Sequence, residues 1–110
     1  MAQEMLPKGL WRVLDGYDVR SFGTACPGCK RDYQQGERLV VAAAREAKAA
    51  EWRVGSIVCS ECHRRSFTEE ERRAGAEQLL VDVELVATPV ALVFNGETAR
   101  VLDRSAATSG

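Results

Sequence analysis

Hydrophobic and polar positions alternate most clearly in the second half of the chain. Between residues 78 and 86, Val81 and Val83 alternate with Asp82 and Glu84. A period of two is typical of a strand with one face toward the core and one toward water. The pattern therefore predicts a half-buried strand over 78–86.

A second alternating stretch, VALVFNGETARVL, contains Asn95-Gly96. This dipeptide favours a two-residue hairpin turn, because both central residues of such a turn need positive φ. The sequence therefore predicts a C-terminal hairpin with a defined register. The predicted pairs are Phe94 with Glu97, Leu92 with Ala99, and Val90 with Val101, which leaves Val90, Leu92, Ala99 and Val101 on one apolar face.

The N-terminal stretch LWRVLDGYDVRSF mixes apolar and polar residues around Asp15-Gly16. Since this dipeptide also suits a hairpin turn, we expect two short strands within residues 10–22. Residues 1–9 carry no such pattern and are expected to form a flexible lead-in.

The middle of the chain, residues 39–58, supports two interpretations. Its many alanines favour helix, whereas Leu39-Val40-Val41 and the β-branched residues from Trp52 to Val58 favour strands. Cysteine pairs flank this region at residues 26–29 and 59–62, and they must come together if they bind one metal ion. A hairpin brings the chain back to its starting point, whereas a single helix carries it away. We therefore predict a hairpin with its turn near 46–50.

The segment after the second cysteine pair reads RRSFTEEERRAG. Thr68 with Glu71 three residues later is a capping-box pattern, which predicts a short helix ending near Gly75. The tail, residues 105–110, is expected to be disordered. Together these elements predict one small, β-rich α+β domain over residues 10–104.

All four cysteines fall into two CxxC pairs, Cys26 with Cys29 and Cys59 with Cys62. Two intervening residues let one turn aim both sulfurs at a point, and two such turns make a tetrahedron. Gly28 permits close backbone approach, and Pro27 fixes φ. The pattern predicts one structural Zn²⁺ with these four cysteines as ligands.

The same cysteines allow other chemistry. A thiol redox pair needs only one CxxC and leaves the other unexplained. Rubredoxin-like iron usually has a glycine after each pair, where this chain has Lys30 and His63. His63 itself is expected to be a solvated neighbour of the site. Because four thiolates leave no open coordination position and no nucleophile has an evident base, we expect no enzymatic activity.

The segments CPGC, WRVGSIVC, CSEC, LLVDVELV and VALVFNGETARVL, within residues 24–104, resemble the small four-cysteine zinc-finger proteins of haloarchaea. This similarity implies a treble-clef-like or zinc-ribbon-like core with zinc bound by Cys26, Cys29, Cys59 and Cys62. It implies no particular activity, since most of those proteins have none assigned.

Charge and composition bear on partners. The formal net charge is -1, so a basic face for nucleic acid would have to be local. The candidate residues for anion or nucleic-acid contact are Lys30, Arg31, Arg64 and Arg65. We expect a cytoplasmic, non-enzymatic binding module that engages a protein partner or self-associates, with no membrane segment and no evident small-molecule substrate. A nucleic-acid-binding finger and a CxxC redox protein are the alternatives.

Overall fold

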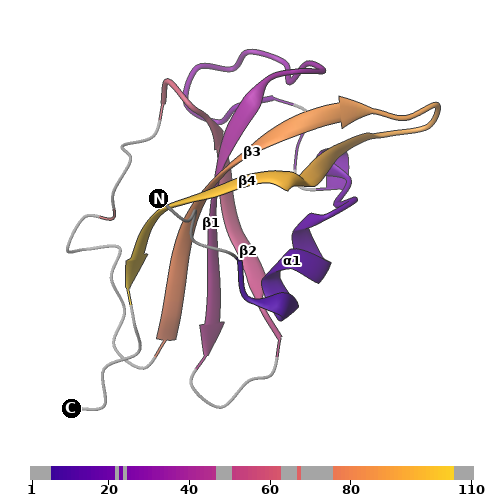
Figure 1. Ribbon diagram of the computed structural model, residues 1–110. Helices are drawn as coiled ribbons and strands as arrows, with labels where there is room; N and C mark the ends of the chain where they lie inside the picture. Colours follow the sequence, from indigo (N-terminus) through magenta and orange to yellow (C-terminus); the bar gives the residue numbers. More distant parts are fainter. Residues whose placement is uncertain are drawn as a thin grey trace.

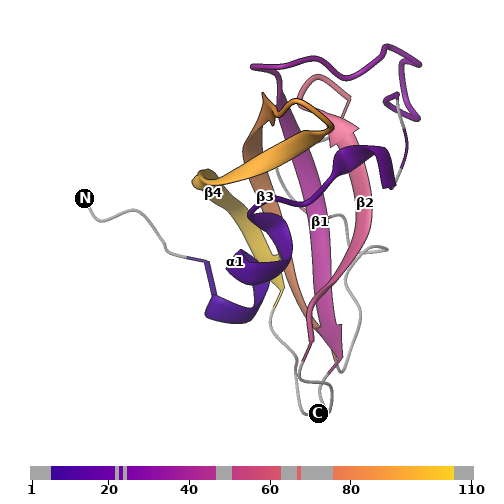
Figure 2. The same cartoon turned by 90° about the vertical axis from the view of Figure 1, so that its right-hand side faces the viewer.

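The computed structural model describes residues 6–21, 23, 25–46, 51–62, 67 and 76–105. It is a small β-rich domain with a helix against one face of a sheet (Figures 1 and 2). Its elements are the helix α1 (Lys8–Leu14), the 3-10 helix η1 (Val19–Ser21) and the strands β1 (Arg38–Glu46), β2 (Arg53–Cys59), β3 (Ala76–Ala87) and β4 (Leu92–Ser105).

The four strands form one antiparallel sheet in the order β2-β1-β3-β4. The predicted central hairpin is confirmed, since β1 pairs with β2 from Leu39 opposite Cys59 to Ala44 opposite Arg53. Its expected turn includes residues 47–50, which lie outside the described part. The alanine-rich segment is a strand because alternate side chains, such as Val41 and Ala43, enter the core.

The main core lies between the sheet and the N-terminal segment that carries α1 and η1 (Figure 2). Leu10, Leu14 and Val19 of that segment are fully buried against sheet residues such as Leu79 and Phe94. Burial of each large apolar side chain stabilises the fold by about 1.5–3 kcal/mol. A smaller cluster of Val40, Phe67 and Leu80 is separate from this main core.

The prediction of two short strands within residues 10–22 is wrong. Residues 8–14 form α1, and only an isolated bridge from Asp18 to Val93 joins this region to the sheet. Leu10 and Leu14 are spaced four apart, so one helix face buries both. Asp15-Gly16 ends this helix, with Gly16 at φ 79° just beyond the C-cap.

The prediction of a hairpin turn at Asn95-Gly96 is also wrong. β4 runs through both residues, and the hairpin partner of β4 is β3, across a turn at residues 88–91. Positive φ is absent from Gly96, as the described glycines with positive φ are Gly16 and Gly36. Instead the β3–β4 register shifts here, from Asp82 opposite Arg100 to Glu84 opposite Asn95.

The predicted strand over 78–86 is confirmed within β3, but it is not half-buried. Asp82 is only 4% exposed, and its carboxylate accepts a hydrogen bond from Arg38 Nε at 2.7 Å. The same guanidinium donates to the Thr98 carbonyl at 2.6 Å. Asp82 was expected to be solvated, and the structure uses it as a buried partner of Arg38 instead.

The short helix expected to begin at Thr68 and the tail after Ser105 also lie outside the described residues. The treble-clef-like or zinc-ribbon-like arrangement stays a prediction, as do the domain bounds at residues 10 and 104. The structure supports the coarser description, a small domain with a four-stranded antiparallel sheet and a cluster of four cysteines.

Candidate metal centre

The first cysteine pair lies on a tight loop closed by an isolated bridge between Ala25 and Asp32. Within it the Lys30 N–H donates to the Cys26 carbonyl at 2.8 Å, and the Cys26 N–H donates to the Arg31 carbonyl at 3.0 Å. Lys30 has φ 65°, the left-handed conformation that turns the chain back after Cys29. The loop therefore holds both thiols on one side.

The second pair begins at the last residue of β2. Cys59 is paired with Leu39 of β1, which fixes its position in the sheet. The Cys62 N–H donates to the Cys59 carbonyl at 3.0 Å, which closes the turn that contains this pair. The second pair is thus attached to the rigid end of a strand, and the first to a loop that packs on it.

The four thiol sulfurs lie within 4.8 Å of one another, and Cys29 Sγ is 3.7 Å from Cys59 Sγ. Zn–S bonds of about 2.3 Å place tetrahedral sulfurs about 3.8 Å apart, so this spacing fits one ion between them. It does not fit a disulfide, whose sulfurs are about 2.05 Å apart. Four convergent soft donors could hold a thiophilic ion such as Zn²⁺.

The four thiols differ in burial. Cys26 and Cys59 are buried, whereas Cys29 and Cys62 are exposed. The site therefore has an inner pair fixed in the core and an outer pair at the surface.

Backbone N–H groups are aimed at the inner thiol of the first pair. Gly28 N lies 3.3 Å and Cys59 N lies 3.4 Å from Cys26 Sγ. Burial by itself raises the pKa of Cys26, but the hydrogen bonds from Cys59, Cys29 and Gly28 outweigh it and lower the pKa to about 6. These donors favour the thiolate, the form that binds metal.

The pKa of Cys62, the outer thiol of the second pair, is shifted in the opposite direction to that of Cys26. Hydrogen bonding to Cys59, Cys26 and Cys29 raises the pKa of Cys62 to about 12. Cys62 therefore tends to keep its proton when no ion is bound. Metal binding would release it, since each ligand must be a thiolate.

Gly28 lies where a side chain would enter the cluster. A Cβ built on Gly28 would lie 3.0 Å from Cys62 Sγ and 3.1 Å from Cys62 Cβ. The close approach expected for Gly28 is therefore confirmed. The two loops come together this tightly only because one of them carries no side chain at this point.

Tyr33 connects the first loop to the sheet. Its hydroxyl donates to the Ile57 carbonyl of β2 at 3.0 Å. Burial first, and then the charges of Cys26 and Cys59, raise the pKa of Tyr33 to about 12. β2 is an edge strand of the sheet, and the first loop binds two of its backbone groups. The Tyr33 hydroxyl binds the Ile57 carbonyl, and Cys26 Sγ accepts the Cys59 N–H.

The predicted basic cluster is only partly visible. Lys30 and Arg31 are exposed beside the first loop, and the Arg31 guanidinium forms an ion pair with Glu37 at 2.5 Å. That partner is the main cause of a raised Arg31 pKa. Arg64, Arg65 and His63 lie outside the described residues.

Two contributors to the site were not singled out for it from the sequence. Tyr33 supports the first loop, but a tyrosine four residues after a CxxC pair carries no specific signal. Lys30 supplies the left-handed turn, and the expected marker of that conformation is glycine. The CxxC spacing, in contrast, was a sufficient signal for the sulfurs themselves.

Comparisons with known proteins give one family. A family model described as a domain of unknown function, DUF8112, matches residues 13–91. No curated protein and no solved structure matches the chain. Within the described residues, no helix is long and apolar enough to cross a membrane.

Proposed function

The chain belongs to the DUF8112 family, a domain of unknown function, and we propose that it is a non-enzymatic binding module built around one structural zinc. The observation that carries the proposal is the convergence of four thiol sulfurs within 4.8 Å. In this proposal Cys26, Cys29, Cys59 and Cys62 are the ligands.

The surroundings of the cluster support the zinc assignment. Two backbone N–H groups point at Cys26 Sγ, which is how thiolates in closed zinc sites are stabilised. Gly28 leaves the space that the ligands need. Four protein ligands complete a tetrahedral shell, so no position is left for a substrate or an activated water. A structural role follows from that closed shell.

A protein partner, or a second copy of the chain, is the proposed target of the module. Val90, at the turn between β3 and β4, is 87% exposed, and Trp11 is 41% exposed. Apolar side chains at such positions are suited to protein contacts. Phe94 of β4 already pairs through its backbone with Gly16 and Tyr17, so self-association through β4 would use the strand beyond Phe94.

The nucleic-acid alternative has less support. Arg31, one of its four candidate residues, is already paired with Glu37. The redox alternative explains only one CxxC pair and gives no role to the convergence of all four sulfurs on one point.

The deciding experiment is elemental analysis of the purified protein together with a thiol count before and after denaturation. We expect one zinc per chain and thiols that react only after denaturation or chelation. Metal-free protein that forms one reversible disulfide in each pair would contradict the zinc proposal and make CPGC a redox motif.

Self-association is tested separately by size-exclusion chromatography with light scattering over a range of concentrations. A mass that rises with concentration supports pairing between copies. A monomer at every concentration contradicts self-association. Binding to a different protein is then tested by pull-down with a defined candidate partner.

A further inference from the structure

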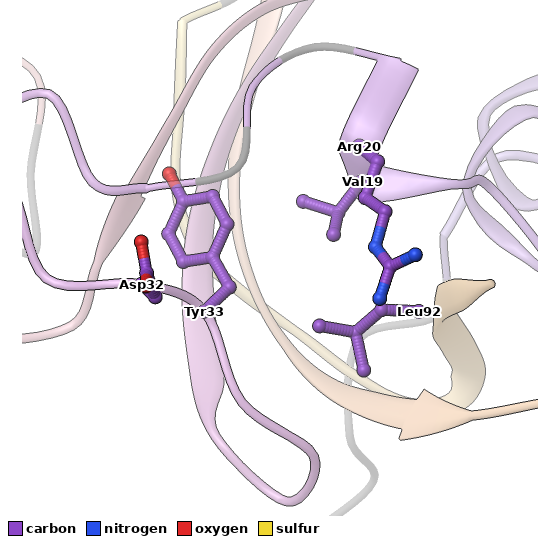
Figure 3. A pocket seen from close by; sticks show the side chains of 5 residues that line it. All are labelled: Val19, Arg20, Asp32, Tyr33 and Leu92. Carbon is purple, nitrogen blue, oxygen red and sulfur yellow. The ribbon is translucent and has the colours of Figure 1, made fainter.

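A cavity lies apart from the four sulfurs, between η1, the segment that follows the first loop, and the start of β4 (Figure 3). Its volume is about 420 Å³. Pockets for small ligands usually measure about 300–1,000 Å³, so this cavity is large enough for a small molecule. It is lined by Val19, Arg20, Asp32, Tyr33 and Leu92.

The wall of the cavity is partly apolar and firmly held. Val19 is fully buried and Leu92 is 8% exposed. The Tyr33 ring is held in place by its hydroxyl hydrogen bond to the Ile57 carbonyl. Because Val19 has no exposed surface, an apolar group in the cavity would rest on the Tyr33 ring and the edge of Leu92, and would leave water there.

Two opposite charges border this apolar wall. Arg20 and Asp32 are exposed, and in Figure 3 their side chains lie on either side of the Tyr33 ring. Within the described part of the chain, neither the guanidinium nor the carboxylate forms an ion pair or a side-chain hydrogen bond. Both charges are therefore available to a ligand.

We propose that this cavity binds a short zwitterionic peptide with an apolar side chain. The C-terminal carboxylate pairs with Arg20, the N-terminal ammonium pairs with Asp32, and the apolar side chain packs on Tyr33 and Leu92. A simple anion fits less well because Asp32 repels it. A free α-amino acid carries both charges on one carbon, whereas the cavity holds its charges on opposite sides of a ring.

The cavity and the metal centre share a segment of chain. Asp32 is paired with Ala25 across the first cysteine loop, and Tyr33 follows directly. A bound ion would hold this wall of the cavity in place, but the cavity proposal does not depend on it, since the peptide contacts none of the four sulfurs.

The test is a two-dimensional ¹H–¹⁵N NMR titration of the full chain, as purified, with the dipeptide L-alanyl-L-leucine. We expect shifts at Val19–Ser21, Asp32, Tyr33 and Leu92, with a dissociation constant on the order of a millimolar for so small a ligand. The N-acetylated and the C-amidated dipeptides should each bind about two- to fivefold more weakly, as expected for the loss of one exposed ion pair.

Matched variants assign each charge. Arg20→Gln should bind the dipeptide and its C-terminal amide equally, and Asp32→Asn should bind the dipeptide and its N-acetyl form equally. Arg12→Gln, which removes an exposed arginine of α1 outside the cavity, should bind as the wild type does. Equal binding of all three peptides by the wild type, shifts confined to other residues, or no shifts would each overturn the proposal.

Zinc content is measured on the same sample, which separates the two proposals. Protein with one zinc per chain that binds no dipeptide overturns the cavity proposal alone. Dipeptide binding with the expected charge dependence in protein without zinc supports the cavity proposal while contradicting the metal proposal.

Discussion

Lys30 adopts φ 65° directly after Cys29, where the chain must turn back for both thiols of the pair to face one point. For a residue with a Cβ this conformation costs about 1–2 kcal/mol, so the loop carries strain. Gly28, two residues earlier, is the converse case, because its lack of a side chain makes room for Cys62. Single backbone positions thus shape the cluster as much as the sulfurs do.

Replacing Lys30 by glycine should raise the free energy of unfolding by about 0.5–1 kcal/mol, because relief of the left-handed strain exceeds the added entropy of the unfolded chain. Urea denaturation measures the change. Lys30→Ala is the matched control, since it removes the charge but keeps the strain. A gain of equal size in both variants would attribute the effect to charge rather than to φ.

Replacing Gly28 by alanine should weaken zinc affinity by about tenfold or more, because the new Cβ would lie 3.0 Å from Cys62 Sγ. Competition with a chromogenic chelator measures the affinity. Gly23→Ala is the control, since the nearest atom to its Cβ would be the Ala25 carbonyl oxygen at 4.0 Å. Unchanged affinity in Gly28→Ala would show that the loops move apart easily.

At the scale of elements, the packing of α1 on β4 decides two local conformations. Asp15 at the end of α1 accepts a hydrogen bond from Gly96 N at 3.0 Å, and Gly16 N donates to the Phe94 carbonyl at 2.9 Å. The two dipeptides expected to form hairpin turns therefore meet each other instead. β4 is irregular at Gly96 where it receives the end of the helix.

Replacing Gly96 by alanine should destabilise the fold by about 1–3 kcal/mol, since its Cβ would lie 2.9 Å from Asp15 Cβ and 3.0 Å from Trp11 Nε1. Thermal unfolding followed by circular dichroism measures this. Gly55→Ala, whose Cβ would lie 3.4 Å from the Ala42 carbonyl oxygen, should change stability much less. Equal melting of the two variants would argue against close packing at Gly96.

The ion pair between β1 and β3 supports a second prediction at this scale. Replacing Arg38 by leucine removes the 2.7 Å ion pair to the buried carboxylate of Asp82, which should cost about 3 kcal/mol. The double variant Arg38→Leu, Asp82→Leu should recover most of that loss. Urea denaturation of both proteins decides the matter, and additive losses would mean that the pair is not coupled.

At the scale of the whole molecule, the cluster of four cysteines joins parts of the chain that are far apart in sequence. The β1–β2 hairpin carries Cys59 back to the loop of Cys26, and Tyr33 bonds that loop to β2. Structural zinc contributes about 10–16 kcal/mol in small zinc domains, whereas domains of this size are stable by about 5–15 kcal/mol. The ion is therefore expected to decide whether the domain is folded.

Replacing Cys26 by serine should abolish the cooperative thermal transition, because it removes a buried ligand at the junction of both loops. Circular dichroism with zinc analysis measures the outcome. Ser60→Ala lies between the ligands of the second pair and serves as the control, which should melt as the wild type does. An unchanged spectrum and melting curve in Cys26→Ser would contradict a structural metal.

The sequence by itself determined the features that depend on short-range patterns. CxxC spacing identified four thiols that the structure brings together, β-branched content together with the need to converge indicated the central hairpin, and period-two alternation indicated the strand within β3. Each of these signals is contained in a few neighbouring residues, and packing in the fold agrees with it.

Only the tertiary structure decided the rest. The turn propensity of Asp15-Gly16 and Asn95-Gly96 contributes less free energy than the burial of Leu10, Leu14 and Phe94. Packing between distant segments therefore decided the conformation at both dipeptides. The partner of Asp82 lies on another strand, and the cavity at Tyr33 combines three separate segments. Contacts between residues distant in sequence have no local pattern, which is why only the assembled fold reveals them.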